Sequence, residues 1–177
     1  IIGISSAHSL VLNTNPYYQS IFSLVYDSGN KALIDTLSHP TIKQMKRIGV
    51  VAGTPPINLM LEYELIEQLA PYHLFVDTRV TSVGEQMIQH LVEKKLSAAV
   101  LWGPISGYYA NKYVPYLSVS PLYGDDSDRN KMSYKITMGV RHGEIEWKRR
   151  LNRFIREHQE QIKQILIGYH IPLVNHN

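Results

Sequence analysis

Two segments of this chain share one pattern, a short apolar strand that runs straight into a helix. The first is RIGVVAGTPPINLMLEYELI at residues 47–66, and the second is LSAAVLWGPISGYYANKY at residues 96–113. The turn reads Gly-Thr-Pro in the first segment and Trp-Gly-Pro in the second. In open α/β sheets, ligands bind at the carboxyl ends of strands, where such turns face one crevice. The pattern therefore predicts an α/β protein built around a cleft.

Composition limits the class of protein further. Of the 177 residues, 44% are hydrophobic and 19% are charged, which is typical of a globular protein. The chain has no cysteine, which excludes disulfides and thiolate chemistry. A net charge of +3 is too weak to indicate nucleic acid without a matching motif. No apolar run approaches the roughly 18 residues of a membrane span, so we expect no membrane insertion.

Strand and helix patterns alternate along the chain, which predicts a parallel or mixed sheet. We expect strands at residues 1–5, 17–26, 47–52, 73–76, 96–102, 116–120 and 133–140. We expect helices at residues 55–69, 83–94, 105–112 and 144–169, and a helical turn at 39–45. Ser82 and Glu85 have the spacing of a capping box before the second helix.

The chain opens directly in the apolar segment Ile-Ile-Gly-Ile, which has the pattern of a buried strand. Such a strand needs neighbours on both sides, so we expect a piece of a longer protein, with apolar surface around residues 1–4 exposed or covered by something else. The alternative is an edge strand at a true terminus.

Four motifs, in this order, carry a family resemblance: GISSAHSLVLNTNPYY (3–18), RIGVVAGTPP (47–56), LWGPISGYYA (101–110) and ITMGVRHG (136–143). The chain resembles the type II periplasmic solute-binding proteins of family 3. Within them it is most similar to the J-type accessory proteins of methanol oxidation (MxaJ and XoxJ), which are encoded with quinoprotein alcohol dehydrogenases.

The resemblance implies a two-lobe α/β fold with mixed sheets that lacks the N-terminal part of lobe 1. Residues 1–20 and 133–177 would form the partial lobe 1, and residues 21–132 would form lobe 2. The hinge would lie near residues 20–23 and 132–136.

The resemblance also implies that a ligand clamp is missing. Amino-acid binders of the family hold the carboxylate with an arginine after the first strand, and the ammonium with an acidic residue in the second turn. Here no arginine precedes Arg47, and Trp102 occupies the acidic position. A carboxylate buried without its partner keeps its desolvation cost, so we expect no binding of common amino acids.

The candidate cleft residues are Ser5, Ser6, His8, Tyr17, Gly53, Thr54, Trp102, Gly103 and Tyr108. Each has a plainer structural interpretation. The Gly53–Thr54 turn can cradle an anion or be an ordinary strand-to-helix turn. Trp102 can stack on a ligand, fill the emptied acidic site, or belong to the core. The tyrosines fit core and rim, and His8 fits an exposed loop.

We find no pattern for catalysis, a metal or a cofactor. The eight histidines are scattered without the His-x-x-x-His spacing, and no P-loop or dinucleotide fingerprint is present. The Gly103–Gly107 segment is out of register for a nucleophile elbow. We therefore expect no enzyme, no metal site and no cofactor.

The densest charge feature is a basic patch of Lys148, Arg149, Arg150 and Arg153. On a helix these side chains lie mostly opposite the apolar stripe, as on a solvated face. Docking to an acidic protein is the second interpretation, and nucleic acid, for which no motif is present, is the third.

The resemblance implies a non-catalytic accessory protein in the periplasm. Its partner would be a subunit of a PQQ-dependent quinoprotein methanol or alcohol dehydrogenase, which it would bind or help to mature. The alternative is the substrate-binding protein of an ABC-type transporter for an unknown small ligand.

Overall fold

The computed structural model describes residues 2–5, 9–29, 33–73, 82–123 and 132–174. The strands are β1 (Ile2–Ser5), β2 (Leu12–Asn13), β3 (Tyr18–Asp27), β4 (Ile48–Val51), β5 (Leu69–Tyr72), β6 (Ala98–Trp102), β7 (Leu117–Pro121) and β8 (Ser133–Val140). The helices are α1 (Pro40–Gln44), α2 (Pro55–Glu62), α3 (Val83–Val92), α4 (Gly103–Ala110), α6 (Ile145–Glu157) and α7 (Gln159–Gly168), and 3₁₀ turns occupy Ile66–Gln68 and Asn111–Tyr113.

The sheet is mixed, which confirms the predicted α/β class. Its strands run in the order β1-β8-β3-β6-β4-β5, with β2 beside β8 and β7 beside β3. β4 pairs in parallel with β5 and β6, whereas β3 is antiparallel to β6, β7 and β8.

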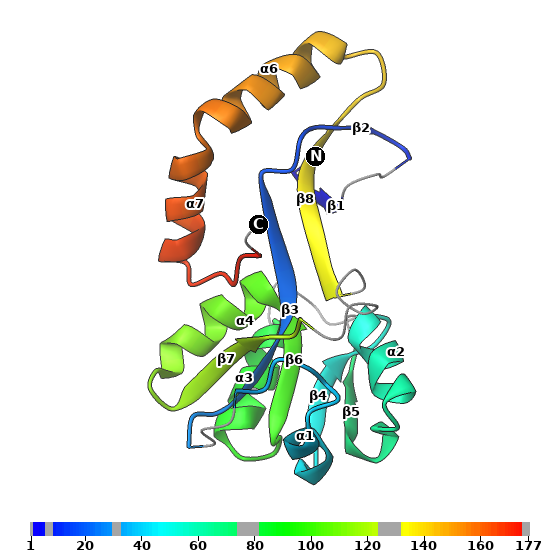
Figure 1. The fold of residues 1–177 in the computed structure, drawn as a ribbon, viewed down its shortest axis with the longest axis vertical. Helices are drawn as coiled ribbons and strands as arrows, with labels where there is room; N and C mark the ends of the chain where they lie inside the picture. Colours follow the sequence, from blue (N-terminus) through cyan, green and yellow to red (C-terminus); the bar gives the residue numbers. More distant parts are fainter. Residues whose placement is uncertain (1, 6–8, 30–32, 74–81, 124–131, 175–177) are drawn as a thin grey trace.

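The long strand β3 changes partners halfway along its length. Its residues 18–21 pair with β8, whereas residues 22–26 pair with β6 and residues 23–27 with β7. This change separates an upper unit (β1, β2, β8, α6, α7 and the first half of β3) from a lower unit that holds β4–β7 and α1–α4. Figure 1 shows β3 and β8 rising from the lower unit toward α6 and α7.

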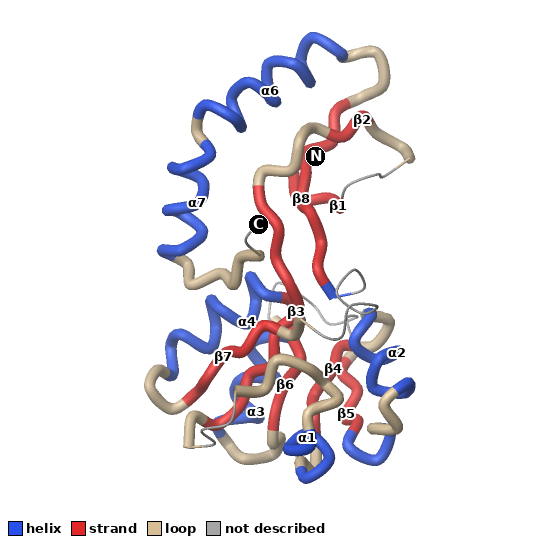
Figure 2. The backbone as a smooth tube through the Cα atoms, in the orientation of Figure 1, coloured by secondary structure: helices blue, strands red, loops and turns tan. Residues whose placement is uncertain are grey.

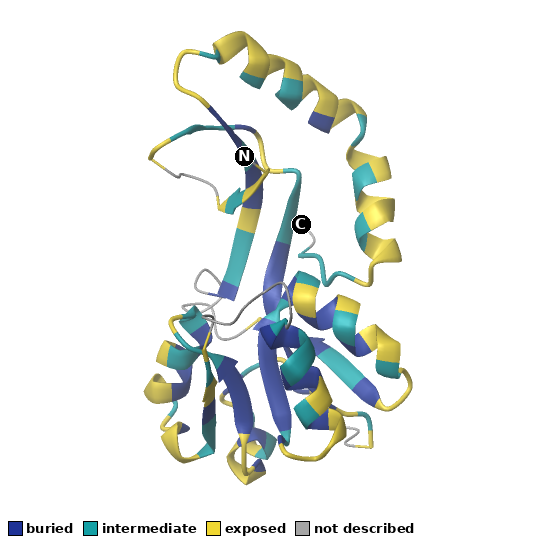
Figure 3. Cartoon of the chain, turned by 180° about the vertical axis from the view of Figure 1, so that it is seen from behind, coloured by how far each residue is buried: buried dark blue, intermediate teal, exposed yellow. Residues whose placement is uncertain are grey.

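The core lies on the two faces of the lower sheet. Because side chains alternate along a strand, Leu24 of β3 faces the α1 and α2 side, and Val25 faces α3 and α4. Met60 of α2 and Met87 of α3, both fully buried, fill the two sides. The lower strands are accordingly the darkest part of Figure 3.

The residues of the upper helices, α6 and α7, are much more exposed to solvent than those of the lower unit (Figure 3). The expected single helical region at 144–169 is two helices, which meet at His158 (φ −115°, ψ 16°). The ring of His158 stacks on Phe154 at 4.1 Å. Among its own residues α6 buries only Ile155, and α7 buries none. Of the other residues of the predicted apolar stripe, Ile145, Phe154 and Ile165 are exposed, and Leu151, Ile162 and Leu166 are partly buried.

Two other helix predictions are wrong in detail. The helix that begins at Pro55 ends at Glu62 rather than near residue 69, because Glu64 adopts a left-handed φ of 57° and the Leu65 N–H donates to the Met60 carbonyl at 2.8 Å. At α3, Ser82 is the N-cap residue, but its side chain makes no capping hydrogen bond. Glu85 instead lies 3.6 Å from the Lys112 ammonium.

Three strand expectations also need comment. β5 was missed, because Pro71 argues against a strand; it is tolerated here at the edge of the sheet. The strand expected at 73–76 falls mostly outside the described residues, and His73 belongs to no strand. β1 is an open strand rather than a buried one, with Ile2 75% exposed. Apolar surface at Ile2 agrees with the expectation of exposure around residues 1–4, and Ile1 is not among the described residues.

Candidate functional site: a cleft at the strand ends

The two turns singled out in the sequence lie at the same end of the lower sheet, where β4 and β6 end. β4 and β6 are parallel neighbours, with Ile48 opposite Ala98 and Val50 opposite Val100. The carboxyl ends of both strands therefore lie at the same end of the sheet (Figure 1), where β4 leads into α2 and β6 into α4. This is the position at which open α/β sheets bind ligands.

A cavity of about 420 Å³ lies at the first of these turns. It is lined by Gly53, Thr54, Pro55, Ile57, Asn58, Glu62 and Tyr134. Tyr134 comes from β8, so the wall of the cavity includes a strand that continues into the upper unit. Of the described lining residues, Glu62 alone carries a charge, and this group includes no arginine that would fork onto a carboxylate.

Three aromatic rings connect this cavity to the second turn. Trp102 lies 5.3 Å from Phe22 and 5.8 Å from Tyr134 between ring centroids, and Phe22 lies 6.4 Å from Tyr134. All three pairs meet edge to face, the geometry that the ring quadrupoles favour. We call Phe22, Trp102 and Tyr134 the aromatic cluster. It joins β3, β6 and β8 where β3 changes partners.

The Gly53–Thr54 turn has few donors for an anion. Gly53 has φ +76°, as a left-handed turn requires. The first two residues of α2, Pro55 and Pro56, have no N–H group. The Thr54 N–H donates to the Val51 carbonyl, as does the Thr54 hydroxyl at 2.6 Å. These features favour the ordinary strand-to-helix turn over the anion cradle.

Gly103 and Tyr108 are not among the described residues that line this cavity. A Cβ at Gly103 would overlap the Ser20 hydroxyl and the Ile21 carbonyl, so the glycine serves chain packing. Tyr108 is 45% exposed and its ring lies 6.2 Å from Tyr169 of the segment after α7. The Lys112 ammonium lies 5.1 Å from the Tyr108 ring, in cation–π contact.

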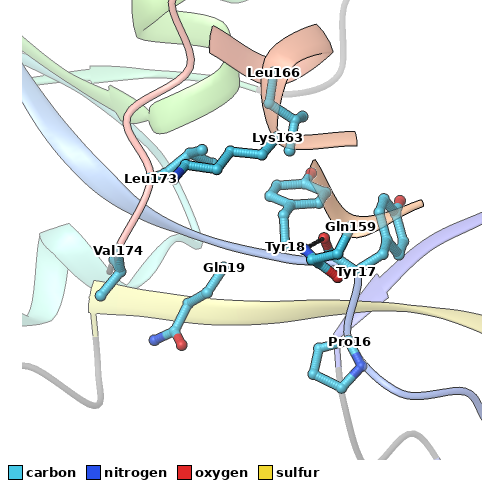
Figure 4. A pocket seen from close by; sticks show the side chains of 9 residues that line it. All are labelled: Pro16, Tyr17, Tyr18, Gln19, Gln159, Lys163, Leu166, Leu173 and Val174. Atoms are coloured by element: carbon cyan, nitrogen blue, oxygen red, sulfur yellow. Dashed lines mark hydrogen bonds between the residues drawn. The ribbon is translucent and has the colours of Figure 1, made fainter. Parts of the chain in front are cut away.

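Tyr17 lines a different cavity, of about 330 Å³, between the start of β3 and α7 (Figure 4). The Gln159 side chain of α7 donates to the Tyr17 carbonyl at 3.1 Å. Burial, with a smaller contribution from Tyr18, raises the pKa of the Tyr17 phenol to about 12. Lys163 and Leu166 line the cavity from α7.

The first loop contributes little to the described cleft. Ser5 ends β1 and is exposed, and its carbonyl lies 3.4 Å from the Asn13 amide nitrogen. Ser6 and His8 lie outside the described residues. The structure thus brings together Gly53, Thr54 and Trp102 through Tyr134, and it places Tyr17, Gly103 and Tyr108 elsewhere.

The basic patch lies on α6. Arg149, Arg150 and Arg153 are exposed, and Lys148 is partly buried. The Arg149 guanidinium lies 2.5 Å from Glu146, and Arg150 lies over the Trp147 ring at 5.7 Å.

Sequence reasoning missed Phe22, Asn58, Glu62 and Tyr134 as cleft residues. Tyr134 carries the one usable signal, because it lies at the predicted return crossover, where β8 must pass the lower unit. Within the described part of the chain, no three His, Cys, Asp or Glu residues gather as a metal site would require. No described helix is both long and apolar enough to cross a bilayer.

This two-unit α/β fold, with a cleft at the strand ends, is that of the periplasmic binding proteins. The crystal structure of the periplasmic binding protein XoxJ from Methylobacterium extorquens AM1 is 33% identical in sequence, with a TM-score of 0.82, over 99% of this chain and 75% of that one. The chain therefore belongs to the family of periplasmic binding proteins that includes XoxJ.

Two further proteins are similar. MxaJ from Methlophaga aminisulfidivorans MPT has a TM-score of 0.81 at 20% identity, over 98% of this chain and 75% of that one. Protein MoxJ of Methylorubrum extorquens is 23% identical over 189 residues, which cover 98% of this chain. The chain spans 62% of the length of MoxJ. No protein-family model matches the chain.

Proposed function

We propose that this chain is a non-catalytic accessory protein of the periplasm that binds, or helps to mature, a PQQ-dependent methanol or alcohol dehydrogenase. Its family is that of XoxJ, and the sequence resembles the J-type proteins encoded with such dehydrogenases. In this proposal the cleft and the α6 patch hold a polypeptide of the dehydrogenase rather than a nutrient.

The observation that carries the proposal is the aromatic cluster at the cleft. A receptor for a zwitterion would present charged groups there, but the position to which the resemblance assigns the acidic residue holds Trp102, which packs against Phe22 and Tyr134. Aromatic side chains beside an open cavity are typical of interface anchors, since they combine apolar area with low conformational entropy.

The direct test is co-purification of the tagged chain with the quinoprotein dehydrogenase subunit from the same organism. We expect the subunit to be retained on the tagged chain at low salt, and to be retained less as salt screens the basic patch. In the control, an unrelated periplasmic protein with a net charge similar to that of the dehydrogenase subunit is offered to the tagged chain. Retention no better than this control would contradict the proposal.

The alternative, a substrate-binding protein of an ABC-type transporter, is favoured by the 420 Å³ cavity, which has the size of a small-ligand site. Calorimetric titration with a panel of standard amino acids separates the two. We expect no measurable heat, because the described lining residues of the cavity include no arginine. One amino acid bound at about micromolar affinity would favour the transport class.

A further inference from the structure

The segment after α7 turns back and runs alongside the first half of β3. His170 has φ 57°, and the Ile171 N–H donates back to the Leu166 carbonyl at 3.0 Å, so α7 ends with a sharp turn. The chain then passes above α4 toward β3, as the red trace in Figure 1 and the loop after α7 in Figure 2 show. We call residues 169–174 the C-terminal strap.

The strap is hydrogen-bonded to β3 at the point where β3 changes partners. Leu173 forms an antiparallel bridge with Ser20, and the Val174 N–H donates to the Gln19 carbonyl at 3.1 Å. The Ser20 hydroxyl, in a fully buried side chain, donates to the Pro172 carbonyl at 2.6 Å. Because Ser20 also pairs with Tyr134 of β8, the strap occupies the other edge of β3.

Two glycines of α4, one turn apart, make room for the strap. A Cβ at Gly107 would overlap the His170 carbonyl oxygen and press on Pro172. A Cβ at Gly103 would overlap Ser20 and lie 3.5 Å from the Pro172 carbonyl oxygen. The Gly-x-x-x-Gly spacing in WGPISG therefore serves close approach of backbone to helix.

The strap contacts the lower unit through His170 and Pro172, which lie against Gly107 of α4. Val174 packs against the same buried cluster as Trp102 and Tyr134. The strap thus begins at α7, passes α4 of the lower unit and ends beside Gln19 of β3. Three segments, β8, β3 and the strap, lie side by side where the two units join.

We infer that the C-terminal strap is a third connection between the units, which holds them in one relative orientation and must be released before they rotate. If β3 and β8 alone connected the two units, the units could bend relative to each other at these two strands. The strap, a third attachment on the edge of β3 opposite β8, opposes this bending. Release of the strap would break the hydrogen bond between the buried Ser20 hydroxyl and the Pro172 carbonyl, which costs free energy. The inference does not depend on the dehydrogenase proposal.

The absence of cysteine in the chain makes a clean distance measurement possible. Cysteines replace Glu67 in the lower unit and Gln161 in the upper unit, both exposed, and carry nitroxide labels whose separation is measured by pulsed electron paramagnetic resonance. The first variant, Gly107→Ala, places a methyl group against the strap. The second ends the chain after Tyr169. Gly168→Ala is the control, because its Cβ meets nothing within 4 Å.

We expect one narrow distance distribution in the parent and in Gly168→Ala, and a broadened or shifted distribution in Gly107→Ala and in the shortened chain. In Gly107→Ala, hydrogen exchange at the Val174 amide should be about tenfold faster. Circular dichroism confirms folding of each variant, and either folded variant is sufficient to decide. A distribution as narrow as that of the parent in a folded strap variant would overturn the inference.

Discussion

Trp102 is the residue at which fold and proposed function meet. Its indole packs against the lower core and meets the ring of Tyr134, in the wall of the cavity, edge to face. Of the three interpretations that the sequence allows, core packing describes this placement, while filling of the acidic position and stacking on a ligand stay predictions. Truncation of the indole would therefore change the cavity wall as well as the core.

The Tyr17 phenol gives a prediction for alkaline pH. Burial raises its pKa to about 12 in the folded chain, against about 10 when unfolded. A raised pKa favours folding fully below pH 10, and this contribution is lost as pH rises toward 12. Tyr17→Phe should therefore show a shallower loss of unfolding free energy between pH 10 and 12, measured by urea denaturation at each pH.

The control for this measurement is Tyr116→Phe, since Tyr116 is 74% exposed. It should follow the parent curve. A Tyr17→Phe curve parallel to that of the parent would show that the phenol is not held neutral by the fold.

At the scale of elements, the sequence predicts best where periodicity and end signals agree. β8 was predicted residue for residue, because its alternation is bounded by polar segments on both sides. α2 was extended too far, because Glu64 in a left-handed conformation has no sequence signal of the kind that glycine gives. The break at His158 has no sequence signal either, because no proline or glycine lies there.

The basic patch of α6 gives an element-scale prediction. In Arg149→Glu/Arg150→Glu, association with an acidic dehydrogenase surface should slow severalfold at low salt and little at high salt, because surface charge acts on encounter. Unfolding should change by less than about 1 kcal/mol, since the Arg149–Glu146 pair is exposed. Stopped-flow mixing measures the rate. Lys43→Glu/Lys46→Glu, an equal charge change in the lower unit, is the control, and an equal slowing would show that net charge, not the patch, matters.

For the whole molecule, the two-lobe division remains a proposal that the pairing of β3 supports. Its partners change between residues 21 and 22, within the hinge range expected from the sequence. The cleft itself was only partly predictable. The strand-end rule identifies Gly53 and Trp102, but Tyr134 joins them through a return crossover more than thirty residues later in the chain. Tyr108 and Gly103 carry no sign that they serve the strap, because that contact depends on where the chain passes after α7.

The measurement that tests the proposed function most directly is the affinity of the dehydrogenase subunit for Trp102→Ala, by surface binding at low salt. We expect a loss of about 1–3 kcal/mol, as for an interface anchor, while Trp102→Phe, which keeps a ring against Phe22 and Tyr134, loses less. If Trp102→Ala is folded and binds the subunit as tightly as the parent, and Arg149→Glu/Arg150→Glu does so as well, neither cleft nor patch is the interface, and the proposal is contradicted.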